Sequence, residues 1–140
     1  IRVEIVGEVS TQKHVEYYKR LDREIRKRKL NDSIRCYLNV PNVEMAEFYR
    51  KADAFILCSN NEPASYSIIE ARGFKLPAIC SDSNGTKGYI DSKFIFESGD
   101  VRSFIQKCEY LLDYKYYCGY RYPSISEYSE FDKFLEICKS

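Results

Sequence analysis

Two glutamates and a short run of small polar residues lie near the middle of the chain, between an apolar segment and a helical pattern. Glu62 is followed by Pro63, and Ser65 introduces a helical pattern that contains Glu70. Proline suits a loop or a first helical turn, and serine suits an N-cap. We therefore predict a helix over residues 65–74, with one carboxylate before it and one inside it.

A helix start and two carboxylates can bind different parts of one ligand. Free N–H groups near Ser65, Tyr66 and Ser67 would bind phosphate without a basic side chain. A carboxylate has two oxygens, which can accept hydrogen bonds from two hydroxyls of a sugar or ribose diol. Glu62 and Glu70 could border such a pocket at different heights, as a nucleotide-sugar would require. The spacing alone equally fits a surface Glu62 and a solvent-facing Glu70 on an ordinary helix.

The elements that must position these residues follow from alternating strand and helix patterns. We predict strands at residues 1–7, 33–38, 54–59, 77–81 and 93–96, and helices at 12–30, 43–52, 65–74, 101–117 and about 129–138. The apolar run at 54–59 suits a strand covered on both faces. Single helices between strands imply right-handed crossovers, so we predict an α/β domain with a doubly wound, Rossmann-like parallel sheet. Its ligand would lie beyond the carboxyl ends of the strands.

Composition narrows the class of protein. With 140 residues, 44% hydrophobic content and a net charge of +1, the chain is typical of a single globular domain and unlike a dedicated nucleic-acid binder. Its six cysteines include no CxxC pair and there is a single histidine, which gives a zinc site almost no support. We expect reduced thiols, no metal and a cytoplasmic location. We detect no signal peptide and no apolar run of membrane-spanning length.

An ordered series of segments resembles a known family. The series comprises the run from Tyr49 to Ser59, Glu62 through Glu70 and Ala71, Pro77, and the Asn84-Gly85 turn. It is similar to the C-terminal, donor-binding domain of retaining GT-B-fold glycosyltransferases, of the glycosyltransferase family 4 or "glycosyl transferases group 1" type. The resemblance extends in order from Gly7 to the C-terminal helix, and the ordered set is more specific than any of its pieces.

The resemblance implies roles at matching positions. Glu70 would bind the ribose hydroxyls of the donor, and Glu62 would lie beside the transferred sugar as the catalytic residue. The backbone amides of the segment Ser65, Tyr66, Ser67 and Ile68 would hold the diphosphate. Gly7 matches the glycine that ends a strand of that domain, and Tyr37 and Leu38 fall where the family lines its base pocket.

The chain also departs from the family pattern. Ser65 and Lys75 stand where the family usually has glycine, with Gly73 two residues before the second position, and Gly88 replaces a frequent acidic residue. We interpret residues 1–140 as a fragment that lacks the N-terminal acceptor domain and the first strand of this domain, with the basic pair that would neutralise the diphosphate.

The function implied is transfer of a hexose from a nucleoside-diphosphate sugar, with retention, to a saccharide or lipid-linked acceptor, as in cell-surface polysaccharide or glycolipid synthesis. The fragment alone would be inactive, and no metal would be needed. The alternative is a catalytically degenerate domain that binds a ligand or stabilises a partner.

Other functions fit less well. A receiver domain needs a phosphoacceptor Asp at the end of its third strand, where this chain has Ser59 and Asn60. A dinucleotide-binding oxidoreductase needs a G-x-G-x-x-G motif after its first strand, where only Gly7 is present. The basic run from Lys19 to Lys29 could contact an anionic membrane surface, but the acidic residues within it favour a solvated helix face.

Overall fold

The structure, a computed structural model, describes residues 1–118. The chain divides into two compact units, Ile1–Phe48 and Tyr49–Ser140, and the boundary falls within a helix. The helix predicted near residues 129–138 lies outside the described residues.

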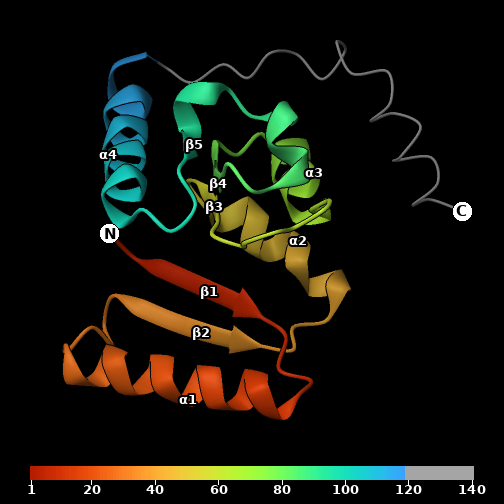
Figure 1. Cartoon of the computed structure of the whole chain (residues 1–140), viewed down its shortest axis with the longest axis vertical. Coiled ribbons are helices and arrows are strands. Elements are labelled where there is room, and N and C mark those ends of the chain that lie inside the picture. Colours follow the sequence, from red (N-terminus) through yellow and green to blue (C-terminus); the bar gives the residue numbers. More distant parts are fainter. Residues whose placement is uncertain (119–140) are drawn as a thin grey trace, which may run out of the picture. The chain divides into compact units, whose positions relative to one another are not determined.

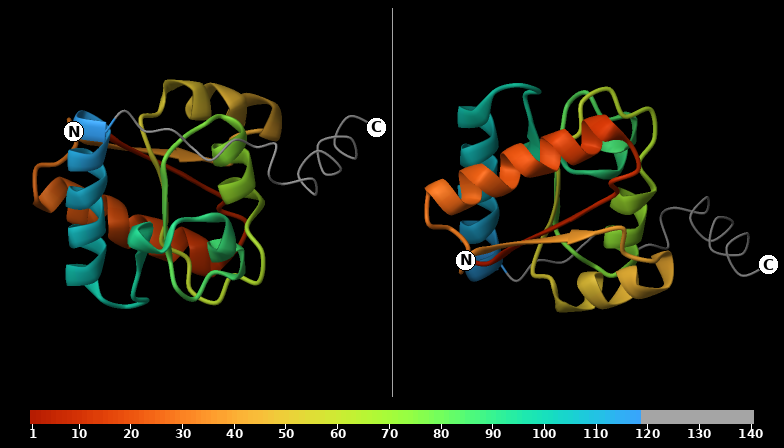
Figure 2. Two further views of the ribbon diagram at one scale, coloured as in Figure 1. Left: turned by 90° about the horizontal axis from the view of Figure 1, so that it is seen from above. Right: turned by 90° about the horizontal axis from the view of Figure 1, so that it is seen from below.

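The first unit is a strand–helix–strand motif. β1 (Val3–Gly7) and β2 (Ile34–Leu38) pair in parallel, in a register that runs from Val3 opposite Ile34 to Gly7 opposite Leu38. α1 (Gln12–Lys27) connects them and lies along one face of the strand pair (Figures 1 and 2). The apolar side of α1 contributes the buried Ile25. The unit ends in α2 (Asn42–Lys51), where Phe48 packs edge-to-face on Tyr37 with ring centroids 4.9 Å apart.

The second unit contains the polar segment of interest and a three-stranded parallel sheet. Its elements in chain order are β3 (Phe55–Leu57), α3 (Tyr66–Gly73), β4 (Ala78–Ser81), η1 (Gly85–Tyr89), η2 (Ser92–Phe94), β5 (Ile95–Phe96) and α4 (Val101–Cys118). The strand order is β3-β4-β5, with α3 and α4 on opposite sides of the sheet (Figure 1). All four residues of the central strand β4 are buried, and the core around it includes Ile68, Phe94 and Leu111.

The predicted α/β class with parallel strands is confirmed, but the strands form two sheets rather than one. β1 pairs with β2, and β3 pairs with β4, without a ladder between β2 and β3 among the described residues. Within the second unit β3 is the outer strand of the order β3-β4-β5, and Ile56 is 42% exposed, so the expected cover on both faces of the run at 54–59 is not found at Ile56 among the described residues. A run of apolar residues predicts a strand, but it does not distinguish the edge of a sheet from its centre.

Two helices end on lysines whose backbone is left-handed. Lys29 after α1 has φ of 56°, and Lys75 after α3 has φ of 60°. After α3, the amide of Leu76 donates to the carbonyl of Ala71 at 2.9 Å and that of Lys75 to Arg72 at 2.8 Å. This pair of bonds is the Schellman arrangement, in which the left-handed residue is most often glycine.

Replacing Lys75 with glycine should therefore stabilise the protein. The left-handed conformation costs a residue with a Cβ about 1–2 kcal/mol, and the greater flexibility of glycine in the unfolded chain offsets part of that gain. We expect Lys75→Gly to raise the free energy of unfolding by roughly 0.5–1 kcal/mol, measured by urea denaturation. Lys75→Ala is the matched control, because it removes the same charge but keeps the strain. Equal midpoints for the two variants would contradict this account of the helix end.

Candidate functional site

The loop that carries Glu62 is held by the turn that follows β4. The amide of Gly85 donates to the carbonyl oxygen of Glu62 at 2.8 Å, which joins two loops distant in sequence. A Cβ on Gly85 would overlap the carbonyl oxygen of Pro63 and would lie 2.8 Å from its carbonyl carbon. Glycine is therefore required at this position because the two backbones touch. Asn84 beside it is 1% exposed, and its Oδ1 accepts a hydrogen bond from the amide of Thr86 at 2.9 Å.

Serine side chains join the carboxyl ends of the strands in the second unit. Ser81 donates to the carbonyl oxygen of Ser59 at 2.7 Å and lies 3.1 Å from the hydroxyl of Ser83. Ser83 in turn donates to Ser98 at 3.2 Å and accepts from the amide of Asn61 at 3.4 Å. The sequence pointed to the loops after Ser59 and Ser81, but it gave no sign that they are linked to the segment after β5. The network holds in place the edge of the sheet where ligands of such folds bind.

Ser65 occupies the N-cap position of α3, as predicted, but its side chain does not cap the helix. Its hydroxyl instead lies 2.7 Å from the hydroxyl of Ser67, and the residue is buried, with 5% exposed. The amides of the first turn therefore receive no acceptor from the N-cap side chain. The N–H groups of a first helical turn lie at the positive end of the helix dipole, which favours an anion.

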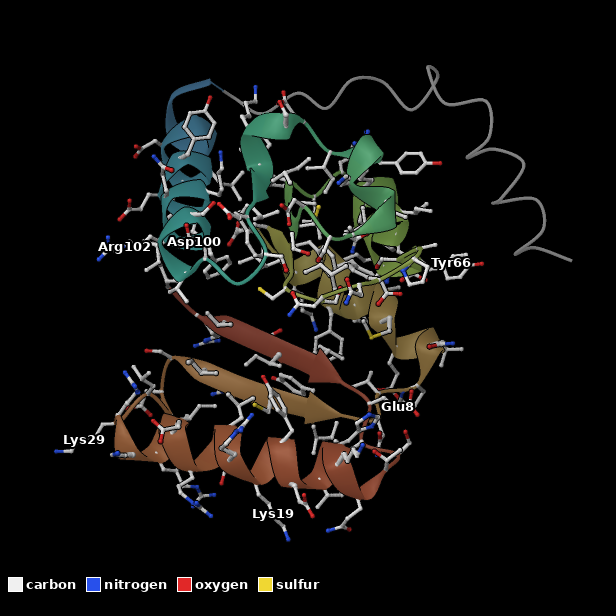
Figure 3. All side chains as sticks on the ribbon, viewed as in Figure 1. Glu8, Lys19, Lys29, Tyr66, Asp100 and Arg102 are labelled. Carbon is white, nitrogen blue, oxygen red and sulfur yellow. The ribbon has the colours of Figure 1, made fainter. Side chains whose placement is uncertain are left out.

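The next three residues differ in accessibility. Tyr66 is 63% exposed, and its side chain extends outward from the start of α3 (Figure 3). Ser67 is half-buried, whereas Ile68 is fully buried in the core with 0% exposed. Because all of Ile68 is inaccessible in this conformation, the amides of Tyr66 and Ser67 are better placed to meet a ligand.

Glu70 is exposed on α3, but one of its oxygens is engaged. The hydroxyl of Tyr49 donates to its Oε2 at 2.8 Å, and Tyr49 itself is only 4% exposed. Burial raises the pKa of the Tyr49 phenol above its usual range, and the hydrogen bond to the Glu70 carboxylate raises it further. Tyr49 therefore keeps its proton at neutral pH and is the donor of this hydrogen bond. Sequence reasoning placed Tyr49 in the family pattern and gave it no role at the site.

The carboxylate of Glu62 has a different environment. Glu62 lies in the loop before α3 and is half-buried, and the carboxylate accepts no hydrogen bond from any residue within the described part of the chain. Glu62, Ser65 to Ile68 and Glu70 thus belong to one continuous segment of the second unit, held at its start by Gly85 and at Glu70 by Tyr49.

The remaining predicted residues lie in the first unit. Gly7 and Leu38 are opposite each other at the carboxyl ends of β1 and β2, and the carbonyl of Gly7 accepts from the amide of Asn39 at 2.9 Å. Tyr37 contacts Phe48 and donates weakly to Glu4 at 3.5 Å. A Cβ on Gly7 would meet nothing within 4 Å, so packing among the described residues does not require glycine there. The part of Tyr37 and Leu38 in a base pocket, and of Gly7 in donor binding, stays a prediction.

The cysteines and the helix lengths bear on two other functions, thiol chemistry and membrane insertion. Cys36, Cys58, Cys80 and Cys108 are free, and burial raises the pKa of the Cys80 thiol to about 11. A thiol of that pKa is protonated at neutral pH and is a poor nucleophile. Among residues 1–118, no helix has the length and apolar character needed to cross a membrane.

The basic residues of α1 are exposed, and Lys19 and Lys29 project away from the ribbon (Figure 3). Two of the other cations form ion pairs along the helix, Arg26 with Asp22 at 2.9 Å and Arg28 with Glu24 at 3.4 Å. Pairs of this kind are typical of a solvated helix face.

Comparison with known protein families identifies the family of this chain. The sequence matches the family described as "Glycosyl transferases group 1" over residues 1–121. The chain belongs to the glycosyl transferases group 1 family. It is therefore a glycosyltransferase domain of the GT-B type, as the resemblance implied. A comparison with curated proteins finds no match.

Two solved glycosyltransferases have a similar fold. A glycosyltransferase from Rickettsia africae ESF-5 superposes with a TM-score of 0.73 at 22% identity, over 82% of this chain and 30% of that one. The catalytic domain of starch synthase IV from Arabidopsis thaliana, whose structure contains ADP and acarbose, superposes with a TM-score of 0.59 at 16% identity, over 80% of this chain and 30% of that one. The chain thus spans about 30% of the length of either protein.

The contact between Gly85 and Pro63 yields a stability test. Gly85→Ala forces the turn and the Glu62 loop apart, so we expect it to lower the free energy of unfolding by about 1–3 kcal/mol. Gly88→Ala is the matched control in the same 3-10 helix, because a Cβ there meets nothing within 4 Å. Thermal or urea unfolding of both variants measures the difference. A Gly85→Ala variant as stable as Gly88→Ala would show that the loops do not touch.

Proposed function

We propose that this chain binds a nucleoside-diphosphate sugar and forms the donor half of a retaining hexosyltransferase. The acceptor would be a saccharide or a lipid-linked sugar, as in the synthesis of a cell-surface polysaccharide or glycolipid. The observation that carries the proposal is the segment from Glu62 to Glu70, in which an uncapped helix start lies between two carboxylates. Membership of the glycosyl transferases group 1 family supports the reaction type.

The diphosphate would bind at the start of α3. No side-chain acceptor from Ser65 satisfies the amides there, and Tyr66 and Ser67 retain exposed surface. During transfer, negative charge develops on the leaving diphosphate, and amides already oriented toward it lower the barrier without reorganising. In the intact enzyme we expect a basic pair from the preceding segment to share this charge, so that no metal is needed. The ADP in the starch synthase IV structure is consistent with this ligand class.

The carboxylates of Glu62 and Glu70 would accept hydrogen bonds from the sugar hydroxyls on either side of the diphosphate. Glu70 would accept from the ribose of the donor, and Glu62 would orient the transferred sugar rather than attack it as a nucleophile. The Glu62 carboxylate is free of hydrogen bonds from the described residues, so it can accept from a ligand without losing an existing contact. Tyr37 and Leu38 would line the base pocket, and Gly7 would be a further donor-binding residue.

The alternative is a degenerate domain that keeps the fold and acts as a binding or partner-stabilising subunit. Ser65, Lys75 and Gly88 motivate it. Lys75 has a left-handed backbone, the conformation that glycine adopts without strain, and a Cβ on Gly88 would meet nothing within 4 Å. Ser65 is therefore the departure with most bearing on function, because it lies at the proposed phosphate site. A chain that binds none of UDP, GDP and ADP would favour this alternative.

Binding of nucleoside diphosphates tests the donor role of Glu70. We expect one of UDP, GDP and ADP to bind by isothermal titration calorimetry, with the same affinity in EDTA as in magnesium. Glu70→Ala should weaken that binding on the order of tenfold to a hundredfold, because a hydrogen bond to a charged acceptor contributes about 1.5–3 kcal/mol.

Inorganic diphosphate provides the internal reference for this experiment, since it lacks ribose and its affinity should not change in Glu70→Ala. Glu109→Ala, which removes an exposed carboxylate from α4, is the matched control. An unaltered nucleotide affinity in Glu70→Ala would exclude ribose recognition by this residue.

The role proposed for Glu62 is tested in the full-length enzyme. Glu62→Ala should reduce kcat about a hundredfold or more, because it removes an interaction that positions the donor sugar in the transition state. The Kd for the nucleoside diphosphate should change less than threefold. Steady-state kinetics and calorimetry separate the two effects, and near-normal turnover would refute the role.

The proposal places the protein in the cytoplasm, in keeping with its free thiols. Peripheral contact with the inner face of the membrane would use the basic face of α1. Lys13, Arg20 and Lys27 are exposed cations of this helix. Sedimentation with vesicles of anionic or neutral lipid decides between this contact and a simply solvated helix.

A further inference from the structure

The hydrogen bond between Tyr49 and Glu70 joins the proposed ribose site to the interior of the protein. Tyr49 lies near the end of α2 and Glu70 lies on α3, so the contact connects two helices. The distance from the Tyr49 hydroxyl to Glu70 Oε2 is 2.8 Å, and the tyrosine is 4% exposed. Glu70 is exposed, so a carboxylate at the surface accepts a hydrogen bond from the hydroxyl of a buried tyrosine.

Packing leaves the Tyr49 ring little freedom to move. The ring stacks on Phe74, with centroids 5.3 Å apart and planes inclined by 21°, and it packs at a tilt on Phe55 at 6.0 Å. Phe74 is the C-cap of the helix that carries Glu70. The helix that carries the carboxylate therefore also provides the ring on which Tyr49 stacks. The raised pKa keeps the phenol protonated, which sets the direction of the bond from tyrosine to glutamate.

This bond changes what Glu70 offers to a ligand. Its Oε2 is engaged by Tyr49, whereas Oε1 accepts no hydrogen bond from any residue that the structure describes. An unrestrained glutamate side chain samples several rotamers, and binding must then offset the entropy lost on ordering it. A carboxylate held by one oxygen presents the other in a defined direction.

We propose that Tyr49 is a positioning residue that orients the Glu70 carboxylate so that Oε1 accepts a hydrogen bond from a ribose hydroxyl. This inference rests on the proposed donor site and assigns Tyr49 a part in selecting ribose. Tyr49 does not touch the ligand and acts through Glu70. A free carboxylate could accept from two hydroxyls of a sugar diol, one at each oxygen. With Oε2 engaged by Tyr49, Glu70 would recognise the ribose through Oε1.

The variant Tyr49→Phe tests this role because it removes the hydroxyl and keeps the ring that stacks on Phe74. Affinities of this chain are measured for the ribonucleoside diphosphate that binds best and for its 2′,3′-dideoxy analogue. In the unmodified protein we expect the ribonucleotide to bind at least tenfold more tightly. In Tyr49→Phe this ratio should fall about fivefold, through weaker ribonucleotide binding alone.

A purely structural role would weaken both ligands equally and leave the ratio unchanged, and that result would overturn the proposal. Tyr18→Phe, in the first unit, is the control for loss of a tyrosine hydroxyl. In a Glu70→Ala background, Tyr49→Phe should have no further effect on the ratio, since the residue acts through Glu70. A further fall in that background would also contradict the proposal.

Circular dichroism verifies that Tyr49→Phe is folded. If it is not, Phe74→Leu keeps the Tyr49 hydroxyl but loosens the ring, and it should lower the same ratio by a smaller factor. An unchanged ratio in a folded Phe74→Leu would count against positioning through the ring. Absence of nucleotide binding by the unmodified chain would instead contradict the proposed function, so the two failures are distinguishable.

Discussion

One backbone contact underlies the geometry of the candidate site: the hydrogen bond from Gly85 to the carbonyl of Glu62. It joins the loop after β3 to the turn after β4, at the carboxyl edge of the sheet where the serine network also lies. The approach is so close that a side chain on Gly85 would overlap Pro63. A loop held by backbone contacts keeps its position whichever side chains it carries, so the Glu62 carboxylate can remain unengaged while its main chain is fixed.

The helix that follows begins in an unusual way for a sequence with serine at the N-cap. Ser65 pairs with Ser67 and does not cap the helix amides. A capped helix start would be more stable in isolation but less available to an anion, because the side-chain oxygen and the phosphate would compete for the same donors. In the proposed donor site the Ser65 hydroxyl would therefore not compete with the diphosphate, so serine in place of glycine at this position is compatible with the proposal.

The carboxylate of Glu70 is held by a hydrogen bond from a buried residue, Tyr49. Glu70 depends on Tyr49, whose ring depends on Phe74 and Phe55, so aromatic packing fixes the direction of a polar contact. Lys75, immediately after Phe74, has the left-handed backbone that ends the helix. The turn that ends α3 therefore also places Phe74 against the tyrosine that orients Glu70.

The sequence by itself determined the alternation of strands and helices, the loop that carries Glu62, and the helix that begins after Ser65. These features are local, because periodicity, proline and serine act over a few neighbouring residues. The order of the matching segments also sufficed for the family resemblance.

Only the tertiary structure decided that the described strands pair as β1-β2 and β3-β4-β5, that Gly85 supports Glu62, and that Tyr49 engages Glu70. Each of these joins residues about twenty positions apart or concerns which strands are neighbours. They depend on how the elements pack, which local patterns do not encode.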